Sequence, residues 1–239
     1  MFGDYFIDKT LITFDLDGTI IKSESTWDAA FKKVMELNGW VWTSAGQYGA
    51  SVRERWERVL AENKLEKARP ITELVELTHT EFFNQLSQLV VTDGFWPFAA
   101  ELKFKHKLPL ALVTNTARVV TDKVVAYLEF GKVFDFVICG DEVKNPKPAP
   151  DIYKKTLDHF KIPAKNTLAF EDSLVGAASA AKAGISIILV WDGVTSVRKY
   201  PDEVIGYTDS FAPLPGNIDT THYADIIKQV KELETEPQP

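Results

Sequence analysis

The sequence predicts an α/β fold: a parallel sheet with helices on both faces, and a small all-α domain inserted after the first strand. Short apolar runs recur along the chain, each followed by turn residues. Helical patterns separate most of these runs, and this alternation favours βα units and a parallel sheet. After the first run, about seventy residues pass without a convincing strand, which is far longer than an ordinary crossover. Together these features are typical of a Rossmann-like core that carries an insertion.

The first predicted strand, Thr10–Phe14, is a short run of apolar and β-branched residues. The insertion after it contains three helical patterns. The first begins near Ser25, which together with Asp28 resembles a capping box. The second is an apolar stripe around Trp56, and the third begins just after Pro70, where a proline is tolerated in a helix.

Four further apolar runs predict the remaining strands of the core. They are rich in Val, Ile and Leu, as strands buried on both faces of a sheet are. The helices between them have recognisable ends: Gly131 lies where a C′ residue belongs, Pro150 opens a helix, and Ser173 caps another. A last helix is predicted over Tyr223–Leu233. The four predicted strands are Leu110–Thr114, Phe136–Cys139, Thr167–Phe170 and Ile185–Val190.

The insertion divides the chain into two expected domains. Residues 1–22 and 93–239 form the α/β core, and residues 23–92 form a helical cap, with hinges near Lys22–Ser25 and Thr92–Gly94. Four of the six tryptophans lie in the cap, where a small helical unit needs large side chains to build a core.

Charge and cysteine content argue against several classes of protein. With 27 Lys and Arg against 34 Asp and Glu, the net charge is −7, which is unfavourable for binding nucleic acid or a membrane surface. The single cysteine, Cys139, permits no internal disulfide. No stretch approaches about 18 apolar residues, the length of a membrane helix, and the N-terminus lacks the pattern of a signal peptide. We therefore expect a soluble cytoplasmic protein with no nucleic-acid and no membrane partner.

Polar side chains concentrate where the predicted strands end. Ligands of open α/β sheets bind at the carboxyl ends of the strands, so these residues are candidates for function. Carboxylates follow the first and fourth strands, a hydroxyl and an amide end the second, and a lysine lies in the loop after the third. The candidates are Asp15, Asp17, Thr114, Asn115, Lys147, Glu171 and Asp172.

The chemistry of these groups is complementary. Crowded carboxylates repel one another and need a cation, and such oxygen ligands suit Mg²⁺, which binds through carboxylates, waters and a substrate phosphate. Lys147 supplies a second positive charge, and Thr114 with backbone N–H groups at a helix N-terminus completes an oxyanion-binding pocket. A carboxylate nucleophile, a carboxylate acid/base, a metal and a lysine together predict phosphoryl transfer through an aspartyl-phosphate.

The run Asp15–Thr19 reads DLDGT, and the other strand-end motifs follow it in order. With these motifs, nearly the whole chain resembles the haloacid dehalogenase superfamily. The similarity is to its branch with an inserted helical cap, which includes phosphoglycolate phosphatases and β-phosphoglucomutases. The resemblance implies an enzyme of the hydrolase class, with Mg²⁺ as its cofactor and a small phosphorylated metabolite as its substrate.

The resemblance also implies roles for individual carboxylates. Asp15 would be the nucleophile, and Asp17 would protonate the leaving alkoxide and then help to activate water. Asp15, Asp172 and the backbone carbonyl of Asp17 would bind Mg²⁺. Glu171 would contact the metal-binding residues without binding the metal itself.

For the phosphate, the resemblance implies that Thr114, Asn115 and Lys147 are the binding residues. Lys147 would in addition orient Asp15 and offset its charge, which makes it a catalytic residue. The cap would set the substrate specificity. Arg53, Arg55 and Arg58 of the cap are expected to form a solvated helix face.

Two positions depart from the pattern of the family. Many relatives carry Asp at the position of Lys22, and sugar-phosphate mutases commonly carry His at the position of Trp27. The leading expectation is a Mg²⁺-dependent phosphatase, and Trp27 lowers the standing of the alternative, a phosphomutase of the β-phosphoglucomutase type. A 2-haloacid dehalogenase is less favoured because such enzymes usually lack the second carboxylate, which Asp17 supplies here. A non-catalytic phosphate-binding protein is less favoured because no catalytic residue is missing.

Overall fold

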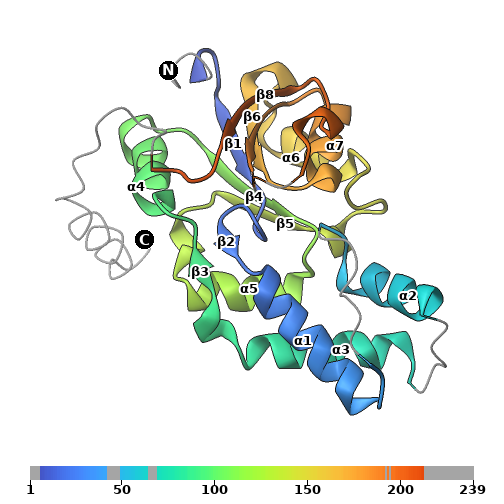
Figure 1. Cartoon of the computed structure of the whole chain (residues 1–239). Helices are drawn as coiled ribbons and strands as arrows, with labels where there is room; N and C mark the ends of the chain where they lie inside the picture. Colours follow the sequence, from blue (N-terminus) through green and yellow to red (C-terminus); the bar gives the residue numbers. More distant parts are fainter. Residues whose placement is uncertain (1–5, 42–48, 64–68, 192, 194, 213–239) are drawn as a thin grey trace.

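The computed structural model describes residues 6–41, 49–63, 69–191, 193 and 195–212 (Figure 1). Its main sheet has six strands in the order β5-β4-β1-β6-β7-β8, and every neighbouring pair is parallel. The strands are β1 (Leu11–Phe14), β4 (Leu110–Thr114), β5 (Phe136–Cys139), β6 (Thr167–Glu171), β7 (Ser186–Val190) and β8 (Val204–Thr208). The predicted α/β class and all five predicted strands are confirmed.

Helices cover both faces of this sheet, as predicted. They are α4 (Phe95–Ala100), α5 (Arg118–Tyr127), α6 (Asp151–Phe160) and α7 (Leu174–Lys182). Side chains of β1 alternate between two apolar clusters: Phe14 packs in one with α4 and α5, and Leu11 packs in the other with α6 and α7. This alternation is the two-residue period of a strand that is buried on both sides.

The inserted segment is helical and begins and ends at a small antiparallel pair of strands, β2 (Ile21–Lys22) and β3 (Val90–Val91). All three predicted helical patterns are helices: α1 (Glu24–Leu37), α2 (Val52–Glu62) and α3 (Ile71–Phe83). Figure 1 shows them gathered together at one end of the sheet. Aromatic side chains make their core, as predicted: Trp27 stacks on Phe82 with ring centroids 3.9 Å apart, and Phe31 lies 4.9 Å from Trp56. The domain boundaries at residues 22/23 and 92/93 stay a prediction.

One local prediction in the insertion needs correction. The capping box expected at Ser25 is wrong, because α1 begins at Glu24 with Ser23 as its N-cap residue. The Ser23 hydroxyl donates to Asp17 and makes no cap hydrogen bond. The capping box lies instead at the start of α2, where the side chains and backbone of Ser51 and Glu54 bond reciprocally.

At the other end of the chain, β8 is a sixth strand that the sequence analysis did not find. It pairs with β7 beyond Trp191, where the pattern of the sequence is least regular. The predicted helix Tyr223–Leu233 lies outside the described residues. None of the described helices has the length and apolar character that crossing a membrane requires.

Candidate active site

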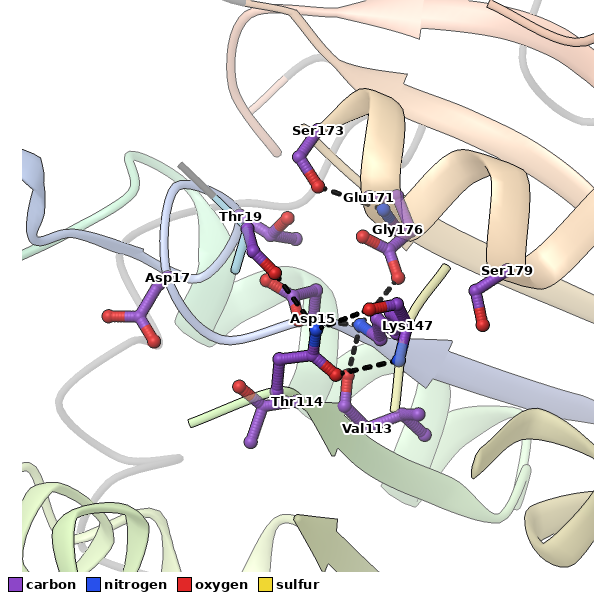
Figure 2. Close-up of polar contacts among 12 residues, drawn as sticks. Asp15, Asp17, Thr19, Val113, Thr114, Lys147, Glu171, Ser173, Gly176 and Ser179 are labelled. Carbon is purple, nitrogen blue, oxygen red and sulfur yellow. Dashed lines mark hydrogen bonds and ion pairs between the residues drawn. The ribbon is translucent and has the colours of Figure 1, made fainter. Parts of the chain in front are cut away.

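A buried lysine connects two carboxylates at the carboxyl ends of the central strands. Asp15 directly follows β1, Glu171 is the last residue of β6, and Lys147 lies in the loop before α6. The Lys147 ammonium donates to Asp15 Oδ1, to Glu171 Oε1 and to the carbonyl oxygen of Val113, each at 2.7 Å (Figure 2). Lys147 is 3% exposed and Glu171 is fully buried, so the ion pairs are shielded from water. Three acceptors therefore fix the ammonium against Asp15.

Tyr153 completes this network from α6, which packs on one face of the sheet. Its hydroxyl donates to Glu171 Oε1, the same oxygen that binds Lys147. The other oxygen, Oε2, is buried and has no hydrogen-bond partner in the described structure. It packs against Gly176, where an added Cβ would lie only 1.8 Å away, so any larger residue at 176 would displace Glu171. The sequence analysis missed Tyr153, because an inward tyrosine on a helix gives no signal of what its hydroxyl meets.

Three carboxylates share this space with one ammonium. Ligand oxygens of Asp15, Glu171 and Asp172 all lie within 4.8 Å of one another. Burial raises the pKa of Asp15 to about 7, although Lys147 opposes the shift, and the charge of Glu171 adds to it. Burial and the charges of Asp15 and Glu171 raise the pKa of Asp172 well above its usual range. For Lys147, burial lowers the pKa, but the two carboxylates outweigh it and the net shift is upward.

This excess of negative charge fits a divalent cation. Hard carboxylate oxygens are the ligands that Mg²⁺ prefers, and a cation would relieve the repulsion that raises these pKa values. The backbone beside the cluster requires a glycine. Gly18 has a φ of +79°, and an added Cβ there would lie 2.2 Å from Asp172 Oδ2 and collide with this carboxylate. The acidic cluster is therefore a candidate metal site, and Glu171 belongs to it along with Asp15 and Asp172.

Asp17 lies two residues from Asp15 but its side chain points elsewhere (Figure 2). Its Oδ1 accepts from Ser23 Oγ at 2.6 Å and from Trp27 Nε1 at 2.8 Å. Its Oδ2 accepts from Thr116 Oγ1 at 2.5 Å. The side chain is therefore not among the clustered metal-ligand oxygens, and only its backbone carbonyl stays predicted as a ligand. Ser23, Trp27 and Thr116 were not recognised as partners of Asp17 from the sequence.

Thr114 and Asn115, at the end of β4, are both buried and lie beside Lys147. The Thr114 hydroxyl accepts from the backbone N–H of Thr116 at 3.0 Å. The Asn115 amide is used differently from the expectation: Oδ1 accepts from the N–H of Lys147, and Nδ2 donates to the carbonyl oxygens of Lys147 and Gly49. Asn115 thus fixes the lysine loop and contacts the inserted segment, and its predicted phosphate contact stays a prediction.

A cavity of about 420 Å³ opens above these residues. The core contributes Asp15, Asp17, Thr114, Asn115, Lys147 and Asp172 to its lining, so the structure brings six of the seven predicted residues to one cavity. The insertion contributes the opposite wall, which includes Glu24, Trp27, Arg53, Val75 and His79.

One prediction for this wall is wrong. Arg55 is only 4% exposed and does not lie on a solvated helix face. Its guanidinium lies 3.4 Å from Asp28 and 4.3 Å from the centroid of the Phe31 ring. A planar guanidinium can pack on an aromatic ring while it keeps a carboxylate partner, which is how this arginine is buried inside the helical insertion.

Comparisons with known proteins identify the family of the chain. A sequence model of the haloacid dehalogenase-like hydrolase family matches residues 9–184. The protein CbbY of Rhodobacter capsulatus is 32% identical over 193 residues, covering 76% of this chain and 84% of the relative. A phosphorylated carbohydrates phosphatase of Thermotoga maritima is 29% identical over 178 residues, covering 74% of this chain and 82% of the relative.

Solved structures of related proteins share the fold of this chain. CbbY from Rhodobacter sphaeroides in complex with phosphate superposes with a TM-score of 0.75 at 26% identity, covering 87% of this chain and 97% of that chain. A β-phosphoglucomutase from Clostridium difficile shares the fold, with a TM-score of 0.73 at 17% identity over 95% of this chain and 100% of that chain. The expected enzyme class, a hydrolase of phosphoric monoesters, is confirmed, and the chain belongs to the haloacid dehalogenase-like hydrolase family.

Proposed function

We propose that this hydrolase is a Mg²⁺-dependent phosphatase that removes the phosphoryl group of a small phosphomonoester through an aspartyl-phosphate on Asp15. One observation carries the proposal: Asp15 lies in a cavity with Lys147 bound to one of its oxygens and two further carboxylates close by. An ammonium contact favours the ionised form of a buried carboxylate, and only the ionised form is a nucleophile.

In the first step, a carboxylate oxygen of Asp15 attacks phosphorus, and the bond from phosphorus to the leaving oxygen breaks. Asp17 gives its proton to that oxygen, and the alcohol departs. In the second step, water attacks the phosphorus of the acyl phosphate while Asp17 takes a proton from it, which releases inorganic phosphate and restores Asp15. Thr114 holds the phosphoryl oxygens through both steps, and the charge of Lys147 offsets theirs.

The metal would be held by Asp15, Asp172 and the backbone carbonyl of Asp17, with Glu171 beside them. When bound, Mg²⁺ supplies positive charge that offsets the charge of the transferring phosphoryl group. The residues of this chain provide the rest: they position the nucleophile, orient the proton donor and, through the helical wall, exclude bulk water.

For the substrate, we propose a phosphorylated sugar or a metabolite of similar size. The cavity of about 420 Å³ suits a small ligand. Relatives are described as a phosphorylated carbohydrates phosphatase and a fructose-1-phosphate phosphatase. Residues 23–92 would act as the cap that selects this substrate, over a core formed by residues 1–22 and 93–239. No contact in the described structure favours the mutase alternative.

The test is phosphate release from a panel of sugar, nucleotide, glycolate and glycerol phosphates. The substitution Asp15→Asn should lower kcat by at least about a thousandfold, because the nucleophile is lost. The control is Asp158→Asn, which alters an exposed aspartate of α6 and should leave kcat unchanged. A hydroxylamine-sensitive phosphoenzyme should form in the native protein and be absent from Asp15→Asn. Undiminished turnover by Asp15→Asn would overturn the proposal.

A further inference from the structure

Hydrogen bonds from both the core and the insertion hold the Asp17 side chain. Thr116, which follows β4, binds Oδ2, whereas Ser23 and Trp27 at the start of the helical insertion bind Oδ1. Asp17 and Trp27 both line the cavity. The indole of Trp27 is 4% exposed and stacks on Phe82 at 3.9 Å, so its direction is fixed by packing.

We propose that Trp27 is a positioning residue that aims the Asp17 carboxyl group for proton transfer to the leaving oxygen of the substrate. The proposal rests on the proposed function, because that function makes Asp17 the acid/base. The contact is short and direct, because the indole N–H of Trp27 lies 2.8 Å from Asp17 Oδ1.

The three donors differ in what they can fix. The hydroxyls of Ser23 and Thr116 rotate, and each can donate or accept a hydrogen bond. An indole N–H can only donate, so Oδ1 of Asp17 must stay an acceptor whether or not the carboxyl group carries a proton. The proton therefore belongs on Oδ2, where the Thr116 hydroxyl can turn to accept from it.

This arrangement has a consequence for different substrates. An alkoxide leaves poorly and needs a well-aimed proton, whereas a nitrophenolate leaves readily without one. If Trp27 only supported the fold, its loss would slow both kinds of substrate equally. If it aims Asp17, its loss will slow alkyl phosphates selectively.

The experiment compares kcat/KM for a sugar phosphate with kcat/KM for 4-nitrophenyl phosphate in Trp27→Phe, which keeps a ring against Phe82 and removes the N–H. We expect a loss of about 10- to 100-fold on the sugar phosphate and less than about threefold on the aryl phosphate. Trp27→His, which returns a ring N–H, should recover part of the loss on the sugar phosphate.

The matched control is Trp56→Phe. Trp56 Nε1 donates to Thr78 Oγ1 at 2.9 Å inside the helical insertion, so the same kind of bond is lost away from Asp17. This control should change the two kcat/KM values by the same factor. An equal loss on both substrates in Trp27→Phe, or no loss on either, would overturn the inference.

Two further variants keep the test decisive. If circular dichroism shows that Trp27→Phe does not fold, Ser23→Ala removes the other donor to Oδ1; a selective loss on the sugar phosphate supports the inference, and an equal loss overturns it. Asp15→Asn separates this inference from the proposed function. Activity that survives in Asp15→Asn defeats the proposed function, whereas activity lost in Asp15→Asn without substrate selectivity in Trp27→Phe defeats only the role of Trp27.

Discussion

The floor of the cavity and the wall opposite it are built in different ways. We define the floor as Asp15, Lys147 and Asp172, which line the cavity, together with Glu171 and Tyr153, which extend their hydrogen-bond network. The wall is defined as Glu24, Trp27, Arg53, Val75 and His79. Strand ends and the loops and helices packed directly on the sheet supply the floor, whereas three helices of the insertion supply the wall.

The difference lies in what fixes each region. Parallel strands share one hydrogen-bond register, so the ends of β1, β4 and β6 must meet at one edge, and each carries its side chain to the same place. The helices of the wall are held to one another largely by side-chain packing, for example Trp27 on Phe82, and such packing tolerates other residues of similar volume. The floor is therefore constrained to one chemistry, while the wall can change to suit a substrate.

Among the changes to the floor, removing the Lys147 ammonium should have the largest effect on stability and activity. In Lys147→Met, Asp15 and Glu171 lose their common cation in a buried site, and we expect the free energy of unfolding to fall by about 3–5 kcal/mol, with loss of activity. Urea unfolding measures the change. Lys144→Met in the same loop is the control, since Lys144 is exposed, and its stability should not change. Equal stability of the two variants would contradict a floor held by this ion-pair network.

The stability of the floor should depend on pH and on the metal. The ordinary pKa of Asp15 is 3.8 and its pKa in the metal-free protein is about 7, so between these values the folded state holds a proton that the unfolded chain has released. The contribution of Asp15 to the free energy of unfolding therefore falls as pH rises from about 4 to about 7. Calorimetric unfolding in EDTA, compared across this pH range, measures the fall.

Adding Mg²⁺ should reverse this loss, because the cation binds ionised carboxylates in the folded state only. At about one hundred times its dissociation constant, it should add about 2.7 kcal/mol above pH 7 and less at pH 5. Asp172→Asn, which removes one expected ligand, should reduce the gain. The same gain at both pH values would show that the carboxylates of the floor are not the binding groups.

A smaller effect is expected from Tyr153→Phe, which removes one hydroxyl from the floor. Glu171 then keeps Lys147 as its hydrogen-bond partner, so the free energy of unfolding should fall by about 1–3 kcal/mol and activity should fall only moderately. Tyr127→Phe, which alters an exposed tyrosine of α5, is the matched control and should have no effect. A loss of activity as large as that of Lys147→Met would mean that the Tyr153 hydroxyl does more than support Glu171.

The smallest effect concerns the contact between the insertion and the core. The Lys123 ammonium of α5 lies 3.8 Å from the centroid of the Phe83 ring of α3. Lys123→Gln should lower the free energy of unfolding by about 0.5–1 kcal/mol, since the pair is a cation–π contact near the surface. Thermal unfolding of Lys123→Gln, of Phe83→Leu and of the double variant measures the coupling. Fully additive effects would show that the two residues do not interact.

Much of the floor could be predicted from the sequence, because its residues follow regular patterns. The runs Leu110–Thr114 and Thr167–Phe170 indicated buried strands, and the polar residues at their ends were found by position alone. The wall was harder to predict. Arg55 fits an exposed helix face by composition, yet an aromatic ring from a neighbouring helix buries it.

The parallel sheet, the helical insertion and the residues at the strand ends could be predicted, because periodicity and residue type act over a few neighbouring positions. Which of these residues contact one another depends on the fold. Lys147 and Asp15 are 132 positions apart, and Thr116 and Asp17 are 99 apart. Such contacts depend on how strands and helices pack in three dimensions, which is why the partners of Asp17 and the place of Tyr153 beneath Glu171 emerged only with the fold.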